Sequence, residues 1–205
     1  MDKIWLKSYP PGVPAEVDVR EFRSLNEIAT LSFHRFANDT AYVQMGRSMS
    51  YGELEKRSRD LAAWMQKEAG LKKGDRVAIM LPNLLQYPIV IFAALRAGLI
   101  VVNTNPLYTP PELEHQLRDS GAEAIVVLEN FAHVLQKVVA RTKVRIVIVT
   151  AVGDLLGFPK SWIVNYVVRR VRKQVPGWQI AGARTFATVL SAGGRCELEE
   201  VATGP

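Results

Sequence analysis

The chain has 205 residues, 48% of them apolar and 22% charged, which is the composition of a soluble globular protein. Its single cysteine, Cys196, excludes an intramolecular disulfide. The first residues lack the apolar run of a signal peptide, and every apolar stretch is interrupted short of the roughly 18 residues of a membrane span. We therefore expect a cytoplasmic protein, either soluble or peripheral on the inner face of the membrane.

The net charge of +6 is concentrated in one segment of the chain. Between Pro159 and Trp178 the sequence has no acid and five cations, which are Lys160, Arg169, Arg170, Arg172 and Lys173. They account for five of the six excess charges. One basic segment does not make a basic domain, so we expect no nucleic-acid partner.

The first elements are marked by prolines and helix caps. Residues 1–23 are rich in proline and predict an irregular N-terminal arm. Two pairs in which a serine precedes a glutamate by three residues each predict a helix start: Ser24 with Glu27, and Ser50 with Glu53. Between these helices, two short strand-like runs flank Met45-Gly46 and predict a hairpin. The second helix is expected to end at Gly70.

From Gly74 onward, strand-like runs alternate with helical patterns. Four runs have the apolar, β-branched composition of buried strands: residues 76–81, 99–103, 123–128 and 144–150. Helical patterns separate them over residues 87–97, from Thr109 onward and over residues 130–140. This alternation is typical of βαβ units. We predict an α/β fold of three layers, with a mainly parallel sheet flanked by helices.

The pattern changes after Thr150. Residues 153–159 predict a loop, residues 160–175 a basic amphipathic helix, and residues 185–190 a short helix. The acidic tail after Gly194 has no pattern of regular structure. A sheet followed by such a loop-rich tail suggests that the natural fold continues beyond this sequence.

The two faces of the basic helix differ in chemistry. One face combines rings and cations, namely Trp162, Tyr166, Arg169 and Lys173, and the opposite face carries Val164, Val168, Val171 and Val175. The valines would pack on the body of the protein. Rings beside cations are the composition of a membrane-interface contact. The alternative is that the rings pack under residues 176–184 and the cations are solvated.

Three motifs follow one another in the chain. They are Met49-Ser50-Tyr51-Gly52-Glu53-Leu54, then Gly74-Asp75-Arg76-Val77-Ala78 with Leu81-Pro82-Asn83, and then Leu95-Arg96-Ala97-Gly98 leading to Asn105-Pro106. In this order and spacing they resemble adenylate-forming enzymes, the superfamily of acyl-CoA synthetases, luciferases and peptide-synthetase adenylation domains. The runs over residues 83–88 and 103–110 narrow the resemblance to bacterial long-chain fatty-acid–CoA ligases.

The resemblance implies that residues 24–205 form the first subdomain of the large N-terminal domain of such an enzyme, preceded by the arm of residues 1–23. The complete enzyme would use ATP, Mg²⁺ and CoA to convert a fatty acid into an acyl-adenylate and then into acyl-CoA. The family's phosphate-binding loop, of the form YTGGTTGxxKG, is absent from this sequence. We therefore expect a chain truncated before that loop, without catalytic residues or metal ligands, and inactive alone.

The resemblance also suggests contacts with partners. His133 and Lys137, four residues apart on a predicted helix, would lie at the edge that meets the CoA nucleotide. The arm would take part in a homodimer, and the incomplete sheet would self-associate through an exposed edge or apolar surface. Two alternatives stay open: a non-catalytic lipid-surface or oligomerisation module, and a CoA ligase for another acid, such as a coumarate-type ligase.

Overall fold

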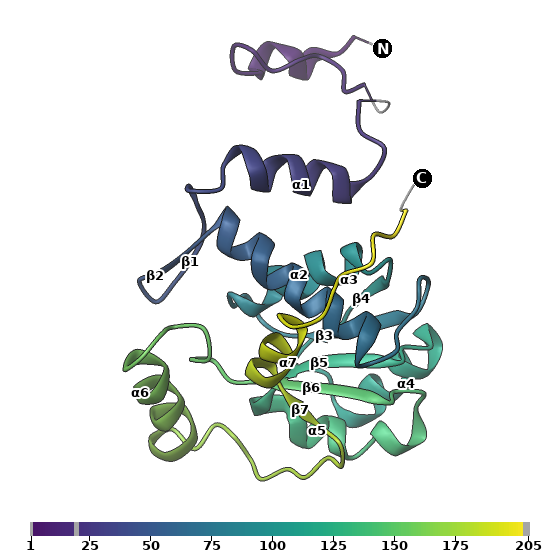
Figure 1. Cartoon of the computed structure of the whole chain (residues 1–205), viewed down its shortest axis with the longest axis vertical. Coiled ribbons are helices and arrows are strands. Elements are labelled where there is room, and N and C mark those ends of the chain that lie inside the picture. The colour runs from purple at the N-terminus through teal and green to yellow at the C-terminus, as the bar shows by residue number, and fades with distance from the viewer. Residues whose placement is uncertain (1, 19–20, 203–205) are drawn as a thin grey trace.

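Within residues 2–18 and 21–202, which the computed structural model describes, five strands form one parallel sheet (Figure 1). They lie in the order β4-β3-β5-β6-β7, and each neighbouring pair is parallel. Their bounds are β3 Arg76–Met80, β4 Ile100–Asn103, β5 Ala124–Leu128, β6 Ile146–Thr150 and β7 Arg184–Thr185. The predicted parallel α/β fold is confirmed. The added strand β7 has only two residues, too few to show a pattern in the sequence.

Helices cover both faces of this sheet and complete the three layers. One face packs against α2 (Tyr51–Lys67), α3 (Gln86–Arg96) and α7 (Phe186–Gly193). The other face packs against α4 (Pro110–Ser120) and α5 (Ala132–Gln136), as Figure 1 shows.

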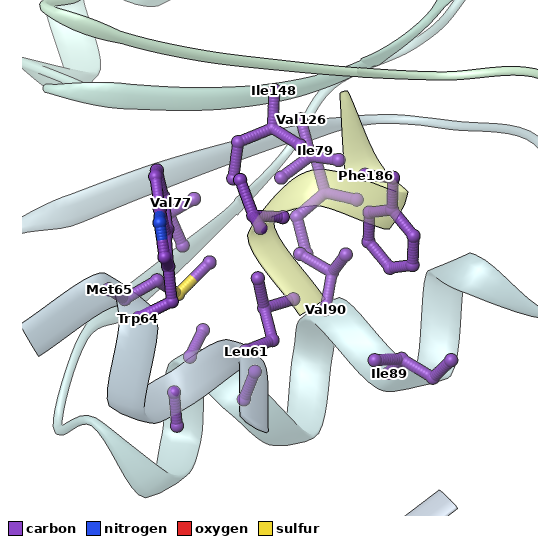
Figure 2. Packing of buried hydrophobic residues seen from close by; sticks show 14 of the residues in the cluster. Leu61, Trp64, Met65, Val77, Ile79, Ile89, Val90, Val126, Ile148 and Phe186 are labelled. Atoms are coloured by element: carbon purple, nitrogen blue, oxygen red, sulfur yellow. The ribbon is translucent and has the colours of Figure 1, made fainter. Parts of the chain in front are cut away.

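Successive side chains along a strand point to opposite faces of the sheet, so each strand contributes to two cores. Val77 and Ile79 of β3 belong to the first core, and the intervening Ala78 together with Met80 belongs to the second. Figure 2 shows the first core, where Val77 and Ile79 face side chains of α2, α3 and α7, among them Phe186. Burying each of the larger side chains contributes about 1.5–3 kcal/mol. Strands that are apolar on both faces therefore require the two helix layers.

The predicted caps begin the first two helices. Ser24 Oγ accepts a hydrogen bond from the Glu27 amide at 3.2 Å, and α1 runs over Leu25–Arg35. Ser50 Oγ accepts from the Glu53 amide at 3.1 Å. Each cap satisfies one of the free amides at a helix start, worth about 1 kcal/mol.

The hairpin also forms where the sequence predicts it. Strands β1 (Thr40–Gln44) and β2 (Arg47–Ser50) pair antiparallel. Met45 has a φ of 49° and Gly46 a φ of 75°. Positive φ at both central residues is the geometry of a two-residue hairpin turn whose twist matches that of the strands.

Residues 2–18 extend beyond α1 at the end of the molecule that is far from the sheet (Figure 1). Their one regular element is the short 3₁₀ turn Ile4–Ser8, which has no buried residue. Large apolar side chains stay accessible here, with Ile4 71%, Trp5 50% and Val17 80% exposed. The arm thus presents apolar surface that the rest of the described chain does not cover.

The helix predicted over residues 130–140 is broken into three pieces. The 3₁₀ turns Glu129–Phe131 and Val139–Arg141 flank the five-residue α5. In the turn after α5 the Val138 amide donates to the Leu135 carbonyl at 3.0 Å, and both side chains lie fully buried in the second core. Asn130 caps no helix; its Nδ2 donates to the Gln174 carbonyl at 3.1 Å.

The basic helix is shorter than the predicted span of residues 160–175. α6 covers Lys160–Tyr166 and continues as one π turn over Val167–Val171. Lys173 then takes a left-handed conformation with a φ of 52°, which ends the helix. The wider π turn shifts the residues that follow it around the axis. Within the π turn Val168 is buried, whereas Val171, predicted to pack beside it, is 64% exposed.

The tail is ordered by contacts with α2 although it forms no helix or strand. Gln66 Nε2 donates to the Glu199 carbonyl, and Gln66 Oε1 accepts from the Glu199 amide, both at 3.0 Å. Lys67 pairs with the Glu199 carboxylate, and Lys73 Nζ donates to the Ala202 carbonyl at 2.7 Å. The Gln66 side chain thus makes the two backbone hydrogen bonds at Glu199 that a partner strand would otherwise make.

Candidate functional site

Two glutamine side chains connect the loops at the carboxyl edge of the sheet. Gln44 of β1 accepts from the Leu85 amide at 2.9 Å and donates to the Val152 carbonyl at 3.1 Å. The fully buried Gln86 donates through Nε2 to Thr150 Oγ1 at 3.0 Å and to the Ala151 carbonyl at 2.9 Å. Because β5 lies between β3 and β6, these bridges span the end of β5.

Asp154 organises the loop after β6. Its Oδ2 accepts from Thr150 Oγ1 at 2.9 Å and from the Ala151 amide at 2.8 Å. Its Oδ1 accepts from Asn165 Nδ2 at 3.0 Å, and Asn165 Oδ1 accepts from the Gly153 amide at 2.8 Å. A Cβ at Gly153 would lie 2.7 Å from Asn165 Oδ1, so glycine is needed where α6 approaches the loop.

An ion pair between a buried glutamate and a half-exposed arginine provides a second link between α6 and the sheet edge. Glu129, directly after β5, is only 5% exposed. Arg169 Nε donates to both carboxylate oxygens at 2.9 Å, and the Arg169 guanidinium reaches Glu129 Oε2 again at 2.8 Å through Nη2. These hydrogen bonds hold the pKa of Arg169 above its ordinary value. The pair fixes which side of the helix faces the body.

A cavity of about 620 Å³ lies between α6 and the ends of β6 and β7. Its walls combine Trp162, Tyr166 and Trp178 with Arg170 and Arg184. In doubly wound sheets, ligands bind at the carboxyl ends of the strands beside the point where the strand order reverses. Here that point lies between β3 and β5, and the glutamine bridges cross it. The cavity lies further along the same edge of the sheet, beside the ends of β6 and β7.

The structure gathers some of the residues singled out in the sequence and separates others. Trp162 and Tyr166 stack with ring centroids 5.6 Å apart and an interplanar angle of 16°. Both line the cavity together with Arg169, which turns inward to Glu129. Lys173 lies beyond the end of the helix and is exposed. Three of the four residues predicted to face outward therefore line this cavity, and Lys173 lies apart from them.

His133 and Lys137 lie on and just after α5, away from the lining of this cavity. His133 is half-buried, and its Nδ1 has no hydrogen-bond partner within the described residues. Lys137 is exposed at the C-cap of the helix.

Sequence reasoning missed four residues that build this site, namely Gln86, Glu129, Asp154 and Asn165. A signal was available for two of them, because Glu129 and Asp154 are acids that follow strands predicted to be buried. Gln86 and Asn165 stand within runs of apolar residues, which carry no indication of their partners.

The carboxylates of the site do not fit a divalent cation. Both oxygens of Glu129 are paired with Arg169, and both oxygens of Asp154 accept protein hydrogen bonds. Among residues 2–18 and 21–202, no group of three or more histidine, cysteine or acidic side chains could hold a metal ion. The same ranges contain no helix long and apolar enough to cross a bilayer.

The fold is shared with adenylate-forming enzymes of known structure. A long-chain-fatty-acid–CoA ligase from Archaeoglobus fulgidus matches 94% of this chain and 34% of its own length, with a TM-score of 0.65 and 23% identity. A benzoate CoA ligase from Burkholderia xenovorans LB400 matches 89% of this chain and 31% of its own length, with a TM-score of 0.66 and 20% identity. These likenesses define the class of fold.

The family follows from the sequence match. The family model described as AMP-binding enzyme matches residues 30–183, and the chain belongs to this family. The long-chain-fatty-acid–CoA ligase of Yersinia pestis is 53% identical over 197 residues, which is 96% of this chain and 35% of the relative. That of Bacillus subtilis is 37% identical over 188 residues. The predicted resemblance is confirmed, and the chain spans about a third of the length of these curated relatives.

Proposed function

We propose that this chain is part of a long-chain fatty-acid–CoA ligase. In that reaction a fatty acid and ATP give an acyl-adenylate and pyrophosphate, and the thiol of CoA then displaces AMP to give acyl-CoA. The observation that carries the proposal is the 53% identity over nearly the whole chain to a ligase of this name. A CoA ligase acting on another acid would retain the fold but show weaker identity to the fatty-acid enzymes.

ATP and Mg²⁺ would be held by parts of such a ligase outside these residues. Forming the adenylate needs hydrogen-bond donors around the phosphates and a cation at the developing charge. The acids at the sheet edge are already paired with protein groups, as described above. In the adenylation step the role of this chain is therefore structural: its sheet supports one side of the enzyme.

A chimera tests the function. The matching 197 residues of the Yersinia pestis ligase would be replaced by the corresponding residues of this chain. We expect the chimera to form acyl-CoA from palmitate, ATP and CoA, because half of the residues are identical and the fold is shared. The isolated chain is expected to form none. A chimera that unfolds cooperatively like the parent ligase yet lacks acyl-CoA formation would contradict the proposal.

CoA is expected to meet the edge formed by His133 and Lys137. Lys137 is exposed and can reach a phosphate, and the His133 ring beside it has a buried Nδ1 without a partner in the described structure. In the chimera, Lys137→Glu should raise the KM for CoA severalfold and leave ATP–pyrophosphate exchange unchanged. Equal effects on both reactions would rule out this assignment.

The arm of residues 1–23 is proposed to join two copies of the protein. Its exposed apolar side chains, including Ile4 and Val17, resemble an interface more than a free surface. Deleting residues 1–23 should convert a dimer into a monomer in sedimentation equilibrium, with the melting temperature of the remaining domain little changed. The proposal fails if the intact chain is monomeric at high concentration or if the deletion leaves the mass of the assembly unchanged.

We also propose that the protein is cytoplasmic and makes peripheral contact with a membrane. The predicted contact residues Trp162, Tyr166, Arg169 and Lys173 motivate this idea. The inward pairing of Arg169 changes which side chains are available for such a contact.

A further inference from the structure

We infer that α6 and the turn before it form a docking face for an anionic lipid surface. This aromatic–basic face consists of Phe158, Trp162, Ile163, Tyr166, Arg170, Arg172 and Lys173. The inference deepens the proposed function, because a long-chain fatty acid, the proposed substrate, is apolar and partitions into lipid. Lipid binding can be measured without catalysis, so its outcome is separate from that of the proposed function.

Exposure and helix geometry place the apolar members together. Phe158 is 90% exposed, Trp162 65%, Tyr166 51% and Ile163 49%. At roughly 100° per residue, the three helical members fall within one stripe about 100° wide. Val164 and Val168 point the other way, and Val168 is buried. Large apolar side chains clustered on one exposed helix mark an interaction surface.

The charges of the segment have one sign. Residues 155–196 contain no aspartate or glutamate, whereas they include seven cations: Lys160, Arg169, Arg170, Arg172, Lys173, Arg184 and Arg195. In the described ranges, the only ion pair of this stretch joins Arg169 to Glu129. Arg170, Arg172 and Lys173 are exposed, and Arg170 lines the same cavity as Trp162 and Tyr166. They are available to phosphate groups.

Polar contacts on the inner side hold the face in a fixed orientation. Asn165 binds the loop after β6, and Arg169 binds Glu129. Lys160 donates to the Met45 carbonyl of the hairpin turn, and Asn130 binds the Gln174 carbonyl after the π turn. With the inner side anchored at these points, α6 projects from the sheet as Figure 1 shows. Docking would require no rearrangement of the body.

The chemistry favours lipid over a second copy of the chain. Two copies meeting through this face would bring like charges together, because the segment has no acids to pair with them. A membrane can complement both the rings and the cations of this face. Tryptophan and tyrosine rings settle at the level of the headgroups, and each lysine or arginine is attracted to anionic lipid. The stacked rings of Trp162 and Tyr166 beside Arg170 match this arrangement.

Vesicle co-sedimentation tests the inference. The whole chain should bind vesicles of equal parts phosphatidylglycerol and phosphatidylcholine and bind pure phosphatidylcholine much less. Arg170→Glu with Arg172→Glu should weaken binding roughly tenfold or more, since both attractions become repulsions. The matched control, Lys72→Glu with Lys143→Glu, reverses the same number of exposed charges elsewhere and should retain most of the binding.

A second pair of variants tests the rings. Trp162→Ala should weaken vesicle binding severalfold, whereas Phe36→Ala, which removes a ring at the end of α1 that is 38% exposed, should not. All variants must show the wild-type thermal unfolding. Absence of binding by the wild type, equal loss with both charge pairs, or unchanged binding by Trp162→Ala overturns the inference. Failure of the chimera to make acyl-CoA leaves these outcomes unaffected.

Discussion

Replacing Gly193 with alanine should lower the free energy of unfolding by about 3 kcal/mol, near the upper end of what overpacking costs. Gly193 is the last residue of α7, at the place where this helix crosses α2. A Cβ there would lie 1.8 Å from the Asp60 carbonyl oxygen and 3.0 Å from the Trp64 Cβ. Backbone atoms cannot move aside like a side-chain tip, so the helices would have to separate. Urea denaturation followed by circular dichroism measures the loss.

Gly194→Ala is the matched control for this prediction. Gly194 has a φ of −62°, and the nearest atoms to an added Cβ, in the Asp60 side chain and the Leu190 carbonyl, lie at 3.6 Å, which is ordinary contact. Alanine fits this conformation and this space, so we expect a change within about 0.5 kcal/mol. Similar midpoints for the two variants would show that α7 does not pack against α2 through Gly193.

Arg169→Ala should destabilise the protein by about 2 kcal/mol, because it leaves the Glu129 carboxylate buried without its partner. The expected cost lies below that of a fully buried pair because the Arg169 side chain is 49% exposed and water can enter after its removal. The adjacent Arg170→Ala is the control. Arg170 is exposed and has no ion pair in the described structure, so its removal should change stability little. Thermal and urea unfolding compare the two variants.

A double replacement separates the ion pair from other effects of the Arg169 side chain. Glu129→Gln with Arg169→Met removes both charges, and it should cost less than the sum of the single variants because no buried charge is left alone. If Arg169→Ala and Arg170→Ala have equal effects, then Arg169 does not face inward in solution. In that case Arg169 would face outward together with Trp162, Tyr166 and Lys173, as the sequence predicts.

Local signals account for the parts of the fold that were predicted correctly. Each cap depends on residues three apart, as with Ser50 and Glu53, and the hairpin turn depends on Met45-Gly46 alone. The four longer strands are visible as short apolar runs, of which β3, β5 and β6 are buried on both faces, whereas the edge strand β4 is only partly buried. Such patterns are complete within a few residues and need no knowledge of the rest of the chain.

The sequence prediction was wrong about which side of α6 faces the body of the protein. A regular helix would place Arg169 outward and Val171 inward. The π turn changes this periodicity, and the burial of Glu129 favours an arginine on the inner side. Glu129 lies 40 residues before Arg169, and no pattern around the helix points to it. The same holds for the tail, whose partner Gln66 lies 133 residues away from Glu199.

The sequence by itself determined the α/β class, the positions of the main strands and the family, because these depend on short-range patterns and on motifs in a characteristic order. The tertiary structure alone decided the strand order, the two-residue strand β7, the glutamine bridges and the inner side of α6. Each of these depends on contacts between residues far apart in the chain. Their partners are selected by packing and by the need to satisfy buried polar groups, which only the assembled fold defines.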